Sequence, residues 1–302
     1  MNFLITGGNG FIGSNAVNFL ISQGHSVVII DNLSSDAHDQ FYYNENATYY
    51  KCDVTDYIMC SDIFEKHNPD YVLHFAAEAR IQKCINDPIK AYESNLIGTL
   101  TLLELCKKYK VKRLVLSSTS AIYGLANEGL LVEDMTSDCL NSYSLSKYAA
   151  EQACKMYSDL YGVSTVCLRY FNVYGPNQPK RGSYAPVIGI FSRQLKNNQP
   201  MTIVGDGLQT RDYVHVYDVV SANFLAAIFE GTLNGDVMNV GTGINYSVLQ
   251  VAKMMGSEYT HLPPRVGEAK HTLANITKIK TILGWQPTRS LKSYLENREY
   301  AS

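Results

Sequence analysis

Three glycines near the start of the chain constrain its fold more than any other feature. Gly7, Gly10 and Gly13 follow an apolar run, residues 2–6, that reads as a buried strand, and they precede residues 14–22, which have helical apolar spacing. Glycines at such a junction let the backbone turn tightly and approach a pyrophosphate, and the new helix offers free N–H groups to phosphates. The spacing predicts a dinucleotide-binding site, although a simple glycine turn would have the same sequence pattern.

An acidic residue and an apolar pair extend this expected site. The second expected strand, residues 26–30, ends in Asp31. An acid at this place binds the ribose 2′-hydroxyl of NAD, so Asp31 favours NAD over NADP. Asp53 and Val54 follow the third expected strand, residues 48–52, and are plausible contacts for an adenine ring.

Strand and helix patterns alternate through the first half of the chain. The expected strands continue at residues 70–75, 114–118 and 165–169, and the expected helices lie at 58–66, 88–108 and 146–161. Such alternation predicts an α/β fold with a doubly wound parallel (Rossmann) sheet, with the ligand at the carboxyl ends of the strands. We expect a smaller C-terminal α/β region to bind substrate. The expected division is residues 1–172 plus 214–241 for the NAD-binding domain and residues 173–213 plus 242–302 for the substrate-binding region.

The expected chemistry centres on a tyrosine, a lysine and a hydroxyl. Tyr143 and Lys147 are four residues apart at the start of an expected helix and so share one face. An ammonium beside a phenol favours the phenolate and lowers the tyrosine pKa from about 10. Thr119 follows the fifth expected strand, where its hydroxyl could bond the same substrate oxygen. Together they would form a base for an alcohol proton, although a helix-start tyrosine with a solvated lysine has the same pattern.

Composition excludes several other classes of protein. The chain has 302 residues, 46% of them hydrophobic, and a net charge of -2, so it should bury a normal core and gives no reason to expect a nucleic-acid partner. No apolar stretch approaches a membrane span, and no export signal is visible at the start. The seven cysteines are scattered and form no Cys-x-x-Cys, so we expect no metal site and a reduced, cytoplasmic protein.

Taken together, these motifs resemble the extended short-chain dehydrogenase/reductase family, in its NAD-dependent nucleotide-sugar epimerase/dehydratase branch. The resemblance covers nearly the whole chain. The matching stretches are residues 7–13, 31, 53–54, 74–77, 117–124, 143–147, 169–176, 205–207, 211–216, 239–243, 264–268 and 283–287.

The resemblance implies a role for each site residue. Tyr143 would be the base, Lys147 would anchor the cofactor ribose, and Thr119, with Ser118 as the weaker candidate, would be the hydroxyl partner. The implied NAD contacts are Gly7, Gly10, Phe11, Ile12, Gly13, Asp31, Asn32, Asp53, Val54, Phe75, Ala76, Ala77, Asn95, Ser117, Tyr143, Lys147, Tyr170 and Phe171. The implied substrate contacts are Thr119, Tyr143, Asn172, Val187, Arg211, Arg265, Glu268 and Thr272.

The substrate contacts divide by the part of the substrate that they would hold. Arg211 and Arg265 would clamp a diphosphate, a task suited to guanidinium groups, and Asn172 would reach the same diphosphate. Glu268 would hold the nucleotide ribose, where many relatives use Asp. Thr272 corresponds to a site that is Tyr in glucose-restricted bacterial epimerases, so it leaves room for a 2-acetamido group.

The residues after Thr119 narrow the implied reaction. In this branch the tyrosine removes a sugar hydroxyl proton while NAD takes the hydride. The 4,6-dehydratases then use an Asp-Glu pair, and the related decarboxylases use a Glu, where this chain has Ser120 and Ala121. The resemblance therefore implies 4-epimerisation of a UDP-sugar, either UDP-glucose/UDP-galactose or the N-acetyl pair, with NAD regenerated in each turnover.

Alternatives remain open for both the reaction and the assembly. A related epimerase or dehydratase could act on a CDP-, GDP- or dTDP-sugar, and a non-catalytic NAD-binding protein could share the fold. The expected helices at residues 89–109 and 147–161 resemble those that pair in the dimer interface of relatives, which predicts a homodimer. Their apolar faces could equally cover the sheet.

Overall fold

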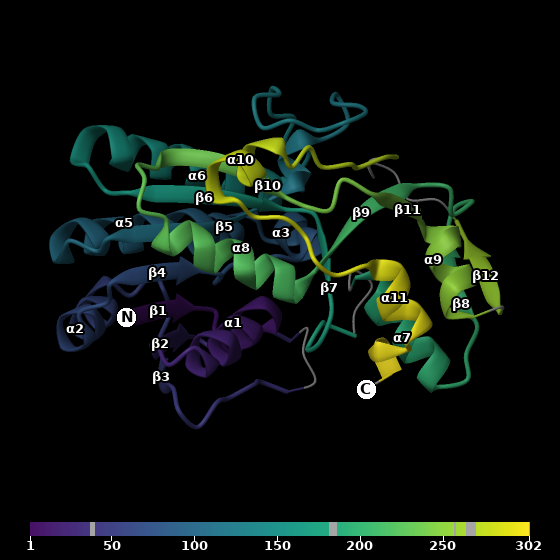
Figure 1. Cartoon of the computed structure of the whole chain (residues 1–302), viewed down its shortest axis with the longest axis horizontal. Helices are drawn as coiled ribbons and strands as arrows, with labels where there is room; N and C mark the ends of the chain where they lie inside the picture. Colours follow the sequence, from purple (N-terminus) through teal and green to yellow (C-terminus); the bar gives the residue numbers. More distant parts are fainter. Residues whose placement is uncertain (37–39, 181–185, 257, 264–269, 302) are drawn as a thin grey trace.

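The computed structural model describes residues 1–36, 40–180, 186–256, 258–263 and 270–301. The chain forms a large first lobe around a central sheet and a smaller second lobe at the right of Figure 1. Among these described residues, none of the helices combines the length and the apolar character that a membrane span needs.

Parallel strands build the central sheet of the first lobe. In the described part of the chain there are seven, in the order β10-β6-β5-β4-β1-β2-β3. Their bounds are β1 (Asn2–Thr6), β2 (Ser26–Asp31), β3 (Thr48–Lys51), β4 (Tyr71–His74), β5 (Arg113–Thr119), β6 (Thr165–Tyr170) and β10 (Asn234–Val240). The strand order reverses between β1 and β4, which makes their carboxyl ends the expected ligand crevice. The predicted doubly wound sheet is confirmed.

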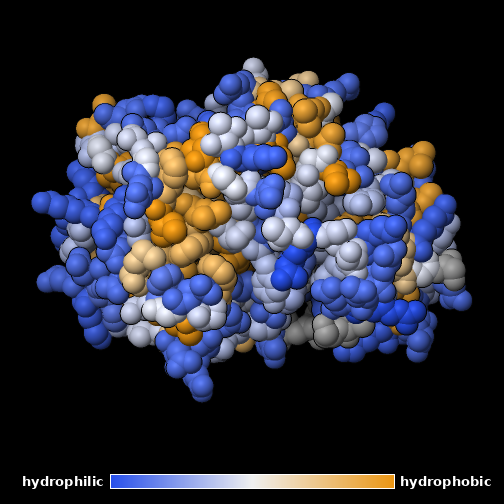
Figure 2. Space-filling view, viewed as in Figure 1, coloured by the Kyte–Doolittle hydropathy of each residue, from blue (hydrophilic) through white to orange (hydrophobic). Residues whose placement is uncertain are grey.

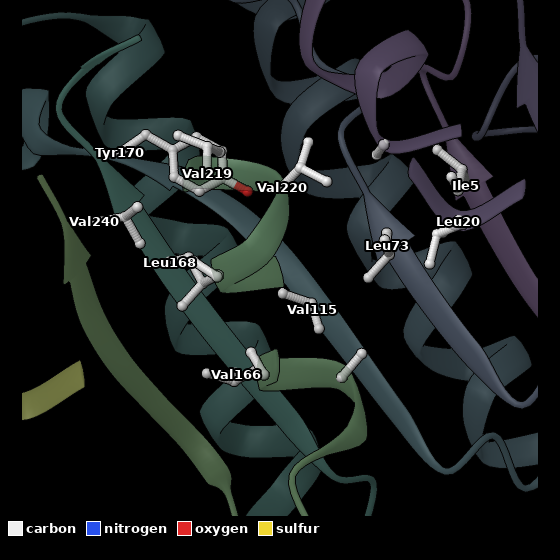
Figure 3. Packing of buried hydrophobic residues seen from close by; sticks show 14 of the residues in the cluster. Ile5, Leu20, Leu73, Val115, Val166, Leu168, Tyr170, Val219, Val220 and Val240 are labelled. Atoms are coloured by element: carbon white, nitrogen blue, oxygen red, sulfur yellow. The ribbon is translucent and has the colours of Figure 1, made fainter. Parts of the chain in front are cut away.

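Helices cover both faces of this sheet because its strands alternate apolar side chains between the faces. Phe3 and Ile5 of β1 pack with the helices α1 (Phe11–Ser22) and α8 (Val216–Ile228). Figure 3 shows this layer, with Ile5 and side chains of the neighbouring strands meeting those of α1 and α8. Leu4 faces the other way, toward the layer that contains α2 (Tyr57–His67), α5 (Gly98–Tyr109) and α6 (Ser142–Tyr161).

Helix α1 begins three residues earlier than the sequence pattern predicted. Gly10 is its N-cap residue, and Phe11 is its first helical residue. The glycine loop therefore leads straight into the first turn of the helix, where unpaired N–H groups are available.

A buried arginine ties the far end of the sheet to helix α8. Arg113, the first residue of β5, is only 6% exposed. Its guanidinium donates to the carbonyl oxygens of Ala226, Ala227, Phe229 and Gly231 at 2.6–3.4 Å. The C-terminal carbonyls of a helix favour a cation, so they compensate this buried charge.

The long helix expected at residues 88–108 is helical throughout but not regular. The segment consists of α4 (Pro88–Tyr92), a π-helical turn η1 (Glu93–Ile97) and α5. The π-turn carries Asn95, which is fully buried. Asn95 accepts a hydrogen bond from the Glu78 N–H at 2.8 Å and donates to Ser146 Oγ at 2.9 Å. The wider turn thus lets Asn95 join the loop after β4 to helix α6.

The second lobe contains two small sheets and its own core. The sheets are β11-β9-β7 and β12-β8, built from β7 (Asn172–Tyr174), β8 (Met201–Val204), β9 (Thr210–His215), β11 (Asn245–Ser247) and β12 (Tyr259–Leu262). Helices α7 (Val187–Lys196), α9 (Val248–Met255) and α11 (Leu291–Glu296) surround a cluster that includes Phe191, Ile203 and Tyr294. In Figure 2, hydrophilic residues cover most of the visible face, and hydrophobic residues show mainly near α8 in the first lobe.

Helix α10 (Thr277–Leu283) returns from the second lobe to the first. It lies beside β10 in Figure 1, and its Ile279 belongs to the core of the first lobe. Among the described residues after Tyr246, the α-helices are α9, α10 and α11.

Candidate active site

A cavity of about 760 Å³ lies at the carboxyl ends of the central strands. Both the loops after the strands and helix α6 line it. The predicted site residues among its lining are Gly7, Gly10, Phe11, Ile12, Gly13, Asp31, Asn32, Asp53, Val54, Phe75, Ala76, Ala77, Ser117, Ser118, Thr119, Tyr143, Lys147, Tyr170 and Phe171. The structure therefore brings most of the predicted residues together around one cavity.

The glycine loop has no room for side chains. Gly7 has φ +70°, and a Cβ atom there would lie 2.8 Å from the backbone nitrogen of Ala76. A Cβ atom on Gly13 would run into the carbonyl oxygen of Gly7. These two glycines leave bare backbone and the first turn of α1 facing the cavity, a cradle that fits a pyrophosphate.

Asp31 and Asp53 are held in place by polar contacts at the end of the cavity beyond the glycine loop. Asp31 accepts hydrogen bonds from the N–H groups of Asn9 at 3.0 Å and Leu33 at 2.9 Å. Asp53 accepts from the Asn32 side chain at 2.7 Å. Burial opposes the charge on Asp53, but hydrogen bonds from Thr55 and Asn32 keep its pKa below the usual value. Both carboxylates are thus fixed acceptors, the type of group that binds ribose hydroxyls.

The tyrosine and the threonine meet at the centre of the cavity. Thr119 is the last residue of β5, and its side chain lies close enough to Tyr143, near the start of α6, to lower the pKa of that tyrosine. The Thr119 oxygen also accepts a hydrogen bond from the Ala121 N–H at 3.1 Å. The geometry provides two hydroxyl groups that one substrate oxygen can contact.

The net shift in the pKa of Tyr143 is upward, opposite to the lowering that was expected beside Lys147. Burial raises the pKa of Tyr143, while the hydrogen bond from Thr119 lowers it by less. Lys147 is itself only 2% exposed, and burial lowers its pKa to about 8. Both groups lose hydration on burial, and this is the largest cause of each shift in pKa.

Ser118 is oriented differently from Thr119. Its hydroxyl donates to Oε1 of Glu151 on α6 at 2.5 Å. Successive side chains of a strand point to opposite faces, so only one of these two hydroxyls can face the tyrosine. The contacts favour Thr119 over Ser118 as the hydroxyl partner of Tyr143.

Behind the cavity, a relay of hydrogen bonds fixes the loop after β4. Thr99 donates to the carbonyl oxygen of Asn95 at 2.7 Å, so its oxygen is free to accept from His74 Nε2 at 3.0 Å. The other ring nitrogen of His74 then accepts from Thr6 at 2.7 Å. Burial, together with the charge of Lys147, lowers the pKa of His74 to about 3. The relay is therefore neutral and structural.

Asn95 belongs to this support and does not line the cavity. Its side-chain nitrogen donates to the Glu78 carbonyl oxygen at 3.1 Å and to Ser146, and its oxygen accepts from the Glu78 N–H. These contacts occupy the whole amide group. A direct contact between Asn95 and a cofactor stays a prediction.

The predicted substrate residues beyond Phe171 lie toward the second lobe, and none of the described ones lines the cavity. Asn172 donates to the Asp212 carbonyl oxygen at 3.1 Å, and Val187 starts α7. Arg211 donates to the Thr210 carbonyl oxygen at 3.0 Å. Arg265 and Glu268 lie outside the described residues.

Thr272 has a buried hydroxyl oxygen without a hydrogen-bond partner among the described residues. Its N–H donates to the Thr210 carbonyl oxygen at 3.1 Å, which places it beside the segment that contains Arg211. A buried polar atom left unpaired is costly, so a partner for it is expected.

Sequence reasoning missed part of the cavity lining. The additional residues include Ser34, Ser35, Asp36, Phe41, Glu78, Arg80, Gln82, Lys83, Asn86, Lys90 and Ser94. Asp36 forms ion pairs with Arg80 and Lys83, so charged side chains of the loops after β2 and β4 meet beside the cavity. Their position after parallel strands was the available signal, since such loops meet at one edge of the sheet.

Comparisons with known proteins find relatives along nearly the whole chain. A model of the NAD dependent epimerase/dehydratase family matches residues 3–241. A UDP-glucose 4-epimerase from Halalkalibacterium halodurans is 34% identical, over 98% of this chain and 94% of its own. The structure of a Thermotoga maritima UDP-glucose 4-epimerase with UDP-glucose has a TM-score of 0.93 at 38% identity, covering 100% of this chain and 98% of that one. A Methanobrevibacter ruminantium UDP-N-acetylglucosamine 4-epimerase, in complex with UDP-N-acetylmuramic acid, has a TM-score of 0.91 at 31% identity, covering 99% and 97%.

Proposed function

This chain belongs to the NAD-dependent epimerase/dehydratase family, and from this premise we propose that it is an NAD-dependent UDP-sugar 4-epimerase. One observation carries the proposal: Thr119, Tyr143 and buried Lys147 line the same cavity, with no carboxylate on the two residues that follow Thr119. The relatives named above are 4-epimerases of UDP-sugars.

The residues of the cavity fit NAD as the cofactor. Gly7 and Gly13 leave backbone open to a pyrophosphate, and Asp31 is a fixed acceptor for a ribose hydroxyl. Phe171 is 3% exposed and lines the cavity beside Tyr170, where a flat ring could pack on it. When bound, NAD supplies reversible hydride transfer with the sugar carbon.

Tyr143 transfers the proton of the sugar hydroxyl. Its phenolate is the base that removes a proton from the sugar hydroxyl, becoming the neutral phenol, and later returns that proton, while Thr119 holds the same sugar oxygen. Burial alone makes the phenolate unfavourable, so the ammonium of Lys147 must supply the opposing charge when the site reacts. The enclosed cavity excludes water and strengthens that interaction.

The turn after Thr119 favours epimerisation over loss of water or of carbon dioxide. Ser120 and Ala121 open a short 3₁₀ helix, η2 (Ser120–Tyr123), and the Ala121 N–H is bonded to Thr119. Neither side chain can act as an acid that drives elimination. The oxidised sugar then has one simple outcome, which is to turn over in the pocket and be reduced on its other face.

Both plain hexoses and N-acetylhexosamines fit the proposed substrate class. Thr272 is small, and its unpaired hydroxyl is a candidate partner for a polar substituent on the sugar, after a modest rearrangement that uncovers it. UDP-glucose/UDP-galactose is the first pair to test, followed by UDP-GlcNAc/UDP-GalNAc.

A second copy of the chain is the proposed partner. Helices α5 and α6 pack side by side, and apolar side chains on α6 and the π-turn face outward. Leu145, Met156 and Leu160 form a stripe on α6, with Leu160 67% exposed, and Ile97 of the π-turn is 46% exposed. Such a patch suits a homodimer interface.

All seven cysteines are free, which supports a cytoplasmic location.

A product assay tests the proposed function. Purified protein, without added NAD, would be incubated separately with UDP-glucose, UDP-galactose, UDP-GlcNAc and UDP-GalNAc. The products would be separated by anion-exchange chromatography and identified by NMR. We expect interconversion of a 4-epimer pair with the cofactor retained on the protein. Conversion of none of these sugars, or release of water from any of them, would contradict the proposal.

A further inference from the structure

One buried carboxylate beside the active site has no role in the reaction described so far. Glu151 is 1% exposed and lies one helical turn after Lys147 on α6. It accepts hydrogen bonds from Ser118 Oγ at 2.5 Å and from Arg169 Nε at 3.0 Å and Nη2 at 2.8 Å. Glu151 therefore joins the helix of the proposed base to the strands that carry Thr119 and Tyr170.

Arg169 is held in turn by the structure around it. Its guanidinium carbon lies 4.8 Å from the centre of the Tyr123 ring, and its Nη1 donates to the Glu133 carbonyl oxygen at 3.3 Å. Tyr123 donates to Asn239 at 2.7 Å. The forked arginine and its carboxylate form a rigid pair, because two parallel hydrogen bonds fix both groups.

The buried charges of this region are two cations and one anion. Lys147, Arg169 and Glu151 are all less than 5% exposed, and only Glu151 is negative. Among the described contacts, no direct ion pair joins Lys147 to Glu151, so the effect of Glu151 on the lysine is electrostatic and acts over a distance. The titratable groups that face this cluster are His74 on β4, Cys167 and Arg169 on β6, Cys139 before α6, and Tyr143 and Cys154 on α6.

The charge of Lys147 is sensitive to its surroundings. Burial lowers its pKa to about 8, and the Cys167 thiol, Glu151 and the Cys154 thiol oppose this effect. The pKa of Cys167 lies well above its ordinary value, so this thiol stays neutral near pH 7 and contributes no charge there. Glu151 is the neighbour that supplies a full negative charge.

We propose that Glu151 is a positioning residue: held by Arg169, its carboxylate fixes Ser118 and keeps Lys147 charged beside Tyr143. This inference rests on the proposed function, in which the ammonium of Lys147 favours the ionised form of the base. Loss of the negative charge leaves two buried cations near each other, and the lysine then releases its proton more readily.

Direct titration of Lys147 tests the inference without any turnover. Lysine labelled with ¹³C at Cε would be followed by NMR against pH, with the Lys147 signal assigned from its loss in Lys147→Met. In Glu151→Gln we expect the pKa of Lys147 to fall by about one unit. The loss of epimerase activity at high pH should move down by the same amount, while KM changes little.

A double variant separates a charge effect from a structural one. Glu151→Gln leaves Arg169 without its partner, and removing one member of a buried ion pair destabilises the folded state. Glu151→Gln/Arg169→Met removes both charges, so the pKa of Lys147 should return to near the wild-type value. A pKa that is unchanged in the single variant, or equally lowered in the double variant, would overturn the proposal. If only the double variant folds, a lowered pKa of Lys147 in that variant would overturn the proposal, and an unshifted pKa of Lys147 would support it.

The same set of measurements keeps this inference separate from the proposed function. A wild-type protein that converts no UDP-sugar contradicts the function, whereas the lysine titration reports only on the charge of Glu151. Thermal unfolding of each variant identifies those that have lost their fold.

Discussion

The hydroxyl groups of Ser118 and Thr119, which are neighbours at the end of β5, hydrogen-bond in different directions. Thr119 meets Tyr143 in the cavity, and Ser118 meets Glu151 in the layer between the sheet and α6. A strand alternates its side chains between two faces, so the consecutive residues Ser118 and Thr119 point to different surroundings. The end of a single strand thus connects the proposed base to the buried ion pair behind it.

Replacement of the proposed base should stop the reaction but leave the cofactor in place. In Tyr143→Phe the ring remains in the cavity and only the hydroxyl is lost. Removal of a general base typically costs about 100-fold to 10,000-fold in rate. We expect turnover near background, with NAD still released in normal amount when the protein is denatured. Retained activity would remove Tyr143 as the base.

The hydroxyl of Thr119 should matter more than its methyl group. Thr119→Ser keeps the oxygen, and we expect activity within a few-fold of wild type. Thr119→Val keeps the shape and removes the donor, and loss of a hydrogen bond of this kind costs about 100-fold in kcat. Parallel kinetics on the two variants would check this. Equal activity of both would mean that the hydroxyl has no part in the reaction.

A larger side chain at position 272 should restrict the substrate. Thr272→Tyr fills the space proposed for a 2-acetamido group, so N-acetyl substrates should lose at least about tenfold more kcat/KM than plain hexoses. Competition between UDP-glucose and UDP-GlcNAc in one reaction would measure the ratio. An equal loss for both would show that this position does not control the sugar pocket.

A charge on the outer face of α6 should separate the two copies. Leu160→Arg places a cation at the C-terminal end of the apolar stripe, on its most exposed residue, where burial in a dimer is unfavourable. Analytical ultracentrifugation should detect monomers. Ile58→Arg, on exposed α2 away from that stripe, is the matched control and should stay dimeric. A dimer that survives Leu160→Arg would place the interface elsewhere.

The buried arginine at the start of β5 should contribute more to stability than its exposed neighbour. Arg113→Met removes the cation from the last carbonyls of α8, and hydrogen bonds to charged groups are worth about 1.5–3 kcal/mol. Lys112→Met breaks only an exposed ion pair with Asp70, and we expect little change. Chemical denaturation of both variants would compare the two. A similar effect in both would argue against the capping role of Arg113.

Local sequence patterns were sufficient to predict six of the seven described strands of the central sheet, but not the edge strand β10. Apolar runs such as residues 2–6 and 114–118 become buried strands because both faces of a parallel sheet are covered by helices. The glycine spacing placed the cofactor cradle because Gly7 and Gly13 satisfy a backbone requirement that no other residue meets. These signals lie within a few residues of each other in the chain.

Features that depend on the third dimension were not predictable in the same way. No pattern near Tyr143 reports how much water its hydroxyl loses, and this determines its pKa. The pairing of Glu151 with Arg169 joins a helix to a strand 18 residues away. The residues at 34–36 and 78–90 line the cavity only because the loops after β2 and β4 converge there.

The π-turn at Glu93–Ile97 changes how side chains before and after it are arranged around the helix axis. One additional residue in a turn shifts everything that follows by about 100° relative to a regular helix. A helical wheel drawn through the whole segment from Pro88 to Tyr109 would therefore assign Ile89 and the residues of α5 to the wrong relative faces. The exposed and buried faces of this segment therefore have to be assigned separately for the residues before Asn95 and for those after it.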